Sequence, residues 1–161
     1  MPLKILALDL ERTLITNCIN RQARPGLYDF LKFCLESFEK VIIFTGVDEG
    51  TTWEVLDELV EKGAIPKEFI GQLEIIDWSG EYKDLNFISD ASVEEILIID
   101  DDESYILPEQ KSQWVSIKPY DPPGVNPWLA MEVQGEPDED EDQELRFIQK
   151  QISKILEENN L

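Results

Sequence analysis

Three short apolar runs, each followed directly by an oxygen-bearing side chain, constrain the fold of this chain more than any other feature of its sequence. They occupy residues 3–8 (LKILAL), 41–44 (VIIF) and 96–99 (ILII). Continuous apolar runs of this length are typical of strands that are buried on both faces of a parallel sheet. The sequence therefore predicts a central sheet, and the residues that end its strands become the first candidates for a functional site.

Segments with helical spacing separate these runs. One helix is predicted to open at Pro25, where the missing N–H costs nothing. A second is predicted between a cap at Asp48 or Thr51 and a stop at Gly63, with Trp53 on its buried face. Shorter predicted elements are a strand at 73–76, a helix at 84–88 and a weaker strand at 114–117. This alternation predicts an α/β fold with a Rossmann-like parallel sheet flanked by helices.

The C-terminal part of the chain differs in composition from the rest. Residues 132–144 contain eight acidic side chains and no basic one, which predicts a solvated, mobile link. An apolar stripe at helical spacing then predicts a C-terminal helix over residues 145–160. With a length of 161 residues, we expect residues 1–161 to form a single domain.

Composition narrows the chemistry and the surroundings. The chain has no histidine, which excludes Ser-His-Asp and Cys-His catalysis and a histidine-ligated zinc site. A net charge of −21 argues against nucleic acid and against an anionic membrane surface as partners. The sequence has no apolar run that could span a bilayer and no secretory signal pattern. Because Cys18 and Cys34 do not make a disulfide framework, we expect a cytoplasmic protein.

The residues that end the strands are rich in carboxylates. Asp9 follows the first run, and Asp100 and Asp101 follow the third, while Glu11 lies two residues beyond Asp9. Because parallel strands direct their carboxyl ends to one edge of a sheet, we expect these side chains to share a pocket. Clustered carboxylates require a cation, and an all-oxygen ligand set favours Mg²⁺. Asp9, Glu11, Asp100 and Asp101 are therefore the predicted metal ligands.

A carboxylate beside such an ion can attack phosphorus and form an aspartyl-phosphate. Phosphoryl transfer depends mainly on positioning the group and on neutralising its oxygens. Thr45, at the end of the second run, can donate a hydrogen bond to a phosphoryl oxygen, and Lys83 can supply a positive charge. The pattern therefore favours the chemistry of a phosphoryl-transfer enzyme.

The motif order resembles that of a known group of enzymes. Asp-x-Glu-x-Thr, strand-Thr-Gly, Lys and strand-Asp-Asp follow one another as in the haloacid dehalogenase (HAD) superfamily of phosphatases. Four blocks are similar to the small C-terminal-domain phosphatases of the NLI-interacting-factor-like group: RPGLYDFL (24–31), VIIFTG (41–46), YKDLNFI (82–88) and LIIDDDESY (97–105). The resemblance covers roughly residues 3–120. It implies a HAD-like fold and a Mg²⁺-dependent phosphatase that acts on phosphoserine in proteins.

The resemblance also implies a role for each site residue. Asp9 corresponds to the nucleophile, and Glu11 stands where the family has its general acid/base aspartate and would bind Mg²⁺ through its backbone carbonyl. The other implied site residues are the phosphoryl-binding Thr45, Gly46 and Lys83 and the metal-binding Asp100 and Asp101.

Glutamate at position 11 is a departure from the family pattern, because it places the carboxylate one methylene further out. It motivates an alternative function, in which the chain is a degenerate HAD domain that binds a phosphorylated partner or acts as a scaffold. A phospho-acceptor domain like the response-regulator receivers is a third interpretation. Motif order disfavours it, because receivers begin with the acidic pair, whereas here the Asp100-Asp101 pair follows the lysine.

The intervals between the motifs bear on the substrate. Neither the stretch from Asp9 to Thr45 nor that from Thr45 to Lys83 has room for a cap domain. An uncapped site favours a phosphorylated protein as the substrate, with a small phosphomonoester as the alternative. The sequence leaves four further side chains open between a role in the site and a structural one: Arg21, Arg24, Trp78 and Trp128.

Overall fold

The computed structural model describes residues 2–122 and 142–159, which contain a four-stranded parallel sheet in the order β2-β1-β3-β4. The strands are β1 (Ile5–Leu8), β2 (Lys40–Ile43), β3 (Ile96–Asp100) and β4 (Trp114–Ser116). In the centre of the sheet, Leu8 lies opposite Ile43 on one side and Ile99 on the other. The parallel α/β fold predicted from the apolar runs is therefore confirmed.

Both faces of the sheet are buried, as its continuous apolar strands require. Along β1, Leu6 and Leu8 point into one apolar cluster, and Ile5 and Ala7 point into the other. All four α-helices contribute side chains to the first cluster. The second cluster is closed by irregular chain that includes Leu85, in the 3-10 turn at Leu85–Phe87, and Ile106, which follows the 3-10 turn at Glu103–Tyr105.

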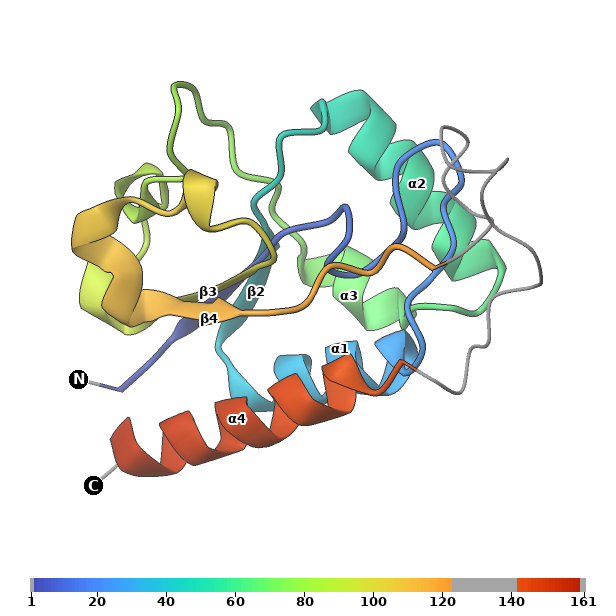
Figure 1. Ribbon diagram of the computed structural model, residues 1–161. Coiled ribbons are helices and arrows are strands. Elements are labelled where there is room, and N and C mark those ends of the chain that lie inside the picture. The colour runs from blue at the N-terminus through green and yellow to red at the C-terminus, as the bar shows by residue number, and fades with distance from the viewer. Residues whose placement is uncertain (1, 123–141, 160–161) are drawn as a thin grey trace.

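The helices are α1 (Leu27–Ser37), α2 (Glu49–Glu61), α3 (Lys67–Gln72) and α4 (Glu144–Asn159). Figure 1 shows α1 and α4 side by side beneath the sheet. The predicted stripe of α4 is buried through Leu145, Ile148 and Ile152, so the C-terminal helix is confirmed. Most of the predicted acidic link lies outside the described residues.

The helix ends follow local chemistry. The Asp48 side chain caps α2 by accepting a hydrogen bond from the Thr51 N–H at 2.9 Å, so the first of the two predicted caps is used. Gly63, with φ of +73°, follows the end of α2 in a conformation that side chains disfavour. α1 begins at Leu27 rather than at Pro25, because Gly26 adopts a left-handed conformation between them.

The strand predicted at residues 73–76 is wrong. The chain there forms a single bridge between Ile43 and Ile75, and the preceding residues form α3, for which the sequence predicted no element. The Gln72 side chain accepts from the Val41 N–H at 3.1 Å and donates to the Val41 carbonyl at 2.8 Å. A side-chain amide thus satisfies the backbone of Val41, and residues 74 and 76 bind the backbone of Ile43 on the same edge of β2.

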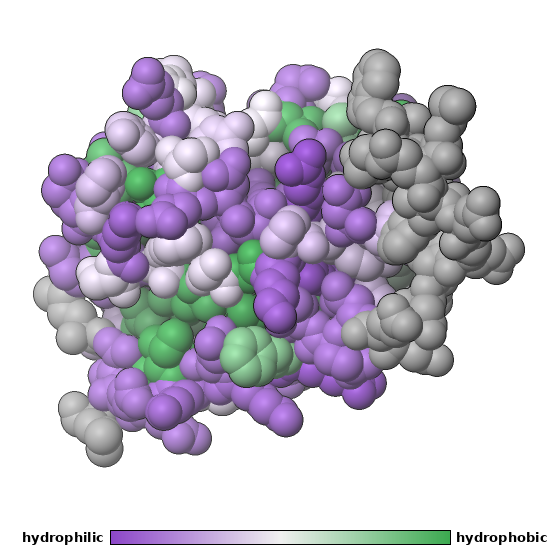
Figure 2. Space-filling view, in the orientation of Figure 1, coloured by the Kyte–Doolittle hydropathy of each residue, from purple (hydrophilic) through white to green (hydrophobic). Residues whose placement is uncertain are grey.

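Surface and core assignments need one further correction. Trp53, expected in the core, is half-buried, and its indole N–H donates to Glu49 on the same helix, whereas Thr52 and Val55 face inward. On the face shown in Figure 2, hydrophilic side chains dominate, and apolar ones gather between β4 and α4 near the exposed Phe147. Among the described helices, none has the length and apolar content needed to cross a membrane.

Candidate active site

The carboxyl edge of the sheet brings three carboxylates together. Asp9 directly follows β1. Asp100 is the last residue of the neighbouring β3, and Asp101 follows it. Because Leu8 and Ile99 are paired in the sheet, these strand ends lie next to each other. Each of the three offers an oxygen, and these oxygens all lie within 4.8 Å of one another. The ends of β1 and β3 therefore meet, and of the predicted residues Asp9, Glu11 and Asp101 line one pocket whereas Asp100 does not.

Lys83 lies between two of these carboxylates. Its ammonium donates to Asp9 Oδ1 at 2.9 Å and to Asp100 Oδ2 at 2.6 Å, and only 2% of the lysine is exposed. The Lys83 N–H donates to the Tyr105 carbonyl at 2.8 Å, and the ammonium lies 4.9 Å from the centre of the Tyr105 ring. Lys83 is therefore held both at its backbone, by the Tyr105 carbonyl, and at its ammonium, by the two carboxylates.

Burial controls the protonation of the cluster. It raises the pKa of Asp9 to about 6, against the opposing effect of the Lys83 ammonium. Burial and the charge of Asp9 raise the pKa of Asp100 to about 6, and burial raises that of Asp101. Burial lowers the pKa of Lys83, but the charges of Asp9 and Asp100 outweigh it and raise that pKa above its ordinary value. Burial thus disfavours the charged form of all three carboxylates, and the Lys83 ammonium offsets this only in part at Asp9 and Asp100.

Asp100 differs from the other two carboxylates in its exposure. It is 0% exposed and lies behind the pocket wall, with Oδ2 bonded to Lys83 and Oδ1 accepting from the Asp102 N–H at 3.0 Å. Asp9 and Asp101 line the open pocket itself. Asp9 and Asp100 both bind Lys83, but of the two only Asp9 also lines the pocket, together with Asp101.

Thr13 is a site residue that sequence reasoning did not single out. Its hydroxyl donates to Asp9 Oδ2 at 3.0 Å and lies 3.4 Å from Asp101 Oδ1, and the residue is fully buried. It orients Asp9 from the side opposite Lys83. The signal was present in the sequence, because Thr13 is the last polar member of the Asp-x-Glu-x-Thr motif.

Thr45 and Gly46 lie at the end of β2 and line the same pocket. The Thr45 hydroxyl accepts a hydrogen bond from the Val47 N–H at 3.2 Å, which leaves its own proton free to be donated. The Trp78 indole N–H donates to the Thr45 carbonyl at 2.7 Å, and its ring packs edge-on against Phe44. Trp78 therefore supports the backbone of Thr45; Trp128 lies outside the described residues.

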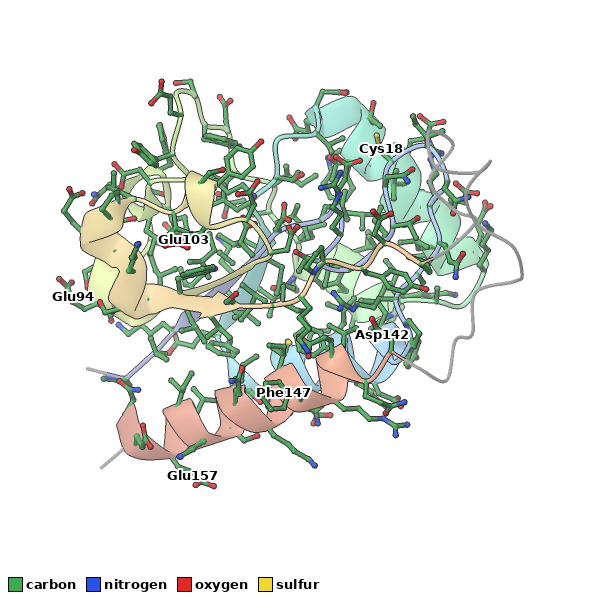
Figure 3. The ribbon with its side chains drawn as sticks, viewed as in Figure 1. Cys18, Glu94, Glu103, Asp142, Phe147 and Glu157 are labelled. Carbon is green, nitrogen blue, oxygen red and sulfur yellow. The ribbon has the colours of Figure 1, made fainter. Side chains whose placement is uncertain are left out.

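Glu11 lines the pocket, and its carboxylate also serves its own loop. Glu11 Oε2 accepts from the Cys18 N–H at 2.9 Å. Figure 3 shows Cys18 close to α2, in the loop that follows β1. One oxygen of the Glu11 carboxylate is thus bound to the backbone of its own loop and not to the Asp9 cluster.

The pocket has a volume of about 410 Å³ and a mostly polar wall. Sequence reasoning missed five further residues that line the pocket, because they come from loops and turns whose spacing carries no periodic signal. They are Arg12, Asn17, Ile19, Tyr105 and Asp121. Of the two arginines left open, Arg21 pairs with Glu54 and Glu58 on α2. Arg24 is buried beneath the loop that follows β1.

The donor set at this edge fits a hard divalent cation. Asp9 and Asp101 offer carboxylate oxygens to the pocket, and hard ions such as Mg²⁺ prefer oxygen ligands with one or two carboxylates. Lys83 supplies one positive charge to three carboxylates, which leaves an excess of negative charge for a metal to offset. The site is therefore chemically suited to the ion that its motifs predicted.

The comparison with protein families agrees with this geometry. The family model of the NLI interacting factor-like phosphatases matches residues 4–130. No curated protein matches the chain. The match covers most of the sequence and all four motifs, so the chain belongs to the NLI interacting factor-like phosphatase family, a family of the HAD superfamily.

Proposed function

We propose that this member of the phosphatase family is a Mg²⁺-dependent phosphomonoesterase that works through an aspartyl-phosphate on Asp9. The observation that carries the proposal is the position of Asp9 in the open pocket, held on one oxygen by Lys83 and on the other by Thr13. A carboxylate fixed at both oxygens is restricted in orientation, which is what in-line attack on phosphorus requires.

In the proposed reaction, an Asp9 oxygen forms a bond to phosphorus while the bond between phosphorus and the ester oxygen breaks. Glu11 gives a proton to the departing oxygen and then takes one from the water that attacks the aspartyl-phosphate. That second step releases inorganic phosphate and restores Asp9. The Thr45 hydroxyl and the Lys83 ammonium bind the phosphoryl oxygens and neutralise part of their charge.

Asp9, Asp101 and the backbone carbonyl of Glu11 would hold the metal, with Asp100 supporting the site through Lys83. When bound, Mg²⁺ neutralises negative charge on the phosphoryl oxygens. The proposal narrows the predicted ligand set, since Asp100 is enclosed by Lys83 and the Asp102 N–H. The side-chain carboxylate of Glu11 is kept for proton transfer.

The proposed substrate is a phosphorylated protein, with small phosphomonoesters as a second class. Between Thr45 and Lys83 the chain forms α2 and α3, whose buried residues Leu56 and Phe69 belong to the core. That interval therefore packs on the sheet rather than over the pocket, which supports access by a protruding phosphorylated loop. Free Cys18 and Cys34 are compatible with a reducing compartment, and we place the protein in the cytoplasm on that basis.

Mg²⁺ should both activate and stabilise the protein. Hydrolysis of an aryl phosphate should require Mg²⁺ and stop when the ion is chelated. At a hundred times its dissociation constant, a bound ion stabilises the fold by about 2.7 kcal/mol, which raises the melting temperature of a chain of this size by about 5–10 °C. Asp101→Ala should abolish this rise, because it removes a carboxylate that lines the pocket.

The control for this melting experiment is sodium at matched ionic strength, which screens all surface acids alike. Asp57→Ala, on the exposed face of α2, should keep the full Mg²⁺ response. An equal Mg²⁺ response in Asp101→Ala and in the unchanged chain would place the ion elsewhere and reject the proposed metal site.

The alternative function is a binding module, and the hydrogen bond from Cys18 to Glu11 favours it. A glutamate engaged with its own loop is a poor proton donor to a leaving group. Glu11→Asp shortens the side chain by one methylene and restores the residue type that the family has. A misplacement of about 1 Å costs on the order of 100-fold in rate, so a detuned enzyme should gain about tenfold or more in kcat.

The same aryl phosphate assay separates the two functions. A gain in Glu11→Asp means that the site is intact and slowed by its glutamate. If neither form hydrolyses the substrate although both show the Mg²⁺-specific rise in melting temperature, the chain binds without turnover, and the enzymatic proposal is wrong. The matched control is Glu103→Asp, because Glu103 is exposed and lies outside the pocket. This variant should leave kcat unchanged.

A further inference from the structure

Arg24 is a buried cation that the proposed reaction does not use. It stands between the loop that follows β1 and the start of α1, and only 1% of it is exposed. One guanidinium nitrogen, Nη1, donates to the backbone carbonyls of Arg12 at 3.1 Å and Thr13 at 3.2 Å. Nη1 therefore contacts the backbone of the loop that carries the site residues, and Arg24 itself is not among the residues that line the pocket.

The rest of the guanidinium is bound by Asp142, a residue 118 positions further along the chain. Arg24 Nε donates to Asp142 Oδ1 at 3.0 Å, and Nη2 donates to Oδ2 at 3.1 Å. The guanidinium carbon Cζ lies over the Tyr120 ring, 5.4 Å from its centre. Figure 3 shows Asp142 just ahead of α4, so the ion pair joins the segment before this helix to the loop after β1.

The loop needs such support because its backbone is strained. Arg12 has φ of +64°, a left-handed conformation that costs a non-glycine residue about 1–2 kcal/mol. Its carbonyl accepts from the Tyr120 N–H at 2.7 Å as well as from Arg24. Conformations of this kind persist when several contacts hold them together.

What the loop holds in place is the orientation of Asp9. Thr13 is one of the two residues whose backbone Arg24 binds, and its hydroxyl donates to Asp9 Oδ2 at 3.0 Å. Glu11 directly precedes the strained residue. A change in the loop backbone would therefore move both the residue that orients Asp9 and the proposed proton donor.

We propose that Arg24 is a positioning residue for the site, and that its ion pair with Asp142 makes the segment ahead of α4 part of the support for the loop that follows β1. Arg24 binds two carbonyls and a carboxylate at once, which a planar guanidinium with five N–H donors can do. Asp142 supplies the counter-charge that keeps this cation buried. The kinetic part of the proposal rests on the proposed phosphatase function; the structural part does not.

Two variants test the proposal in the full chain. Arg24→Lys keeps the charge but cannot serve all four acceptors. Asp142→Asn keeps the shape of the partner and removes its charge. The controls make the same changes at exposed positions: Arg146→Lys on α4 and Asp29→Asn on α1.

The first readout is amide hydrogen exchange, which needs no enzymatic activity. In both test variants, the amides of Arg12, Leu14 and Thr16 should exchange at least about tenfold faster, because their hydrogen bonds depend on the loop fold. The amides of β1 and β3 should keep their protection. The control variants should match the unchanged chain at every one of these amides.

The second readout is the kinetics of aryl phosphate hydrolysis at a temperature where all variants are folded. We expect kcat to fall by about 10- to 100-fold in Arg24→Lys and Asp142→Asn, with KM changed less than about threefold, because misplaced catalytic groups slow the chemical step. The double variant should lose less than the product of the two single losses, since both changes break one interaction.

Two results would overturn the proposal. One is unchanged exchange of the loop amides in both test variants. The other is an equal loss of protection in the loop and in β1, which would mean that the ion pair merely contributes to global stability. If the unchanged chain shows no hydrolysis, the proposed function fails, and the exchange measurement still decides the role of Arg24. Should Arg24→Lys not fold, Asp142→Asn carries the same measurement.

Discussion

Asp9→Asn should lower kcat for aryl phosphate hydrolysis by on the order of 10⁴-fold or more, because the amide oxygen of asparagine cannot form the phosphoryl intermediate. The substitution is nearly isosteric, so the hydrogen bond from Thr13 can be kept. It also removes one negative charge from a cluster in which burial raises the pKa of Asp9 to about 6. The fold should therefore survive, and the loss should fall on kcat rather than on stability. The measurement is steady-state kinetics at saturating Mg²⁺.

The matched control for Asp9→Asn is Asp57→Asn, which makes the same chemical change on the exposed face of α2 and should leave kcat unchanged. Urea unfolding of both variants shows whether each is folded under the assay conditions. Equal activity in Asp9→Asn and in the unchanged chain would mean that Asp9 is not the nucleophile, and the reaction would have to be assigned to another group.

The success of sequence reasoning at Asp9, Thr45 and Asp100 has a simple physical origin. Each follows a continuous apolar run that forms a buried strand, and parallel strands end at a common edge. The meeting of these residues is therefore a property of local pattern and topology. Lys83 is different, because it lies in a turn with no periodic signal. It was proposed for its charge, and the resemblance of the motif order to a family supported that proposal.

Other features depend on contacts between distant residues, which no local pattern encodes. Residues 73–76 are predicted as a strand, yet the pairing is limited to one bridge between Ile75 and Ile43, and the Gln72 side chain binds the backbone of Val41 in β2. The sequence leaves Arg24 open between a role in the site and a structural one, and its burial depends on a partner, Asp142, 118 residues away. The identity of one residue does not show which distant residue it will contact, so the role of Arg24 can be seen only in the structure.

Lys83 is expected to be the residue on which the stability of the site depends most. Lys83→Met keeps the length of the side chain and removes the charge that lies between Asp9 and Asp100. Taking one partner from a buried ion pair leaves uncompensated charge and typically costs about 3–5 kcal/mol. We expect a loss of this size in the free energy of unfolding at pH 7 without divalent ions, measured by urea titration.

The same substitution should be less harmful in acid. The folded-state pKa values of Asp9 and Asp100 are already raised, to about 6 in each case, and removing the ammonium raises them further. A carboxyl group with a raised pKa binds its proton more tightly in the folded state, so its contribution to stability is lost as pH rises and regained as pH falls. The deficit of Lys83→Met should therefore shrink between pH 7 and pH 5.

Lys62→Met provides the control for this titration, because Lys62 forms an exposed pair with Glu58 on α2, of a kind that contributes little to stability. Its unfolding should change little at either pH. If Lys83→Met unfolded at the same urea concentration as the unchanged chain at pH 7, Lys83 would not be the counter-charge of the cluster. A deficit that stayed constant from pH 7 to pH 5 would point instead to lost packing against Tyr105, since packing does not titrate with these carboxylates.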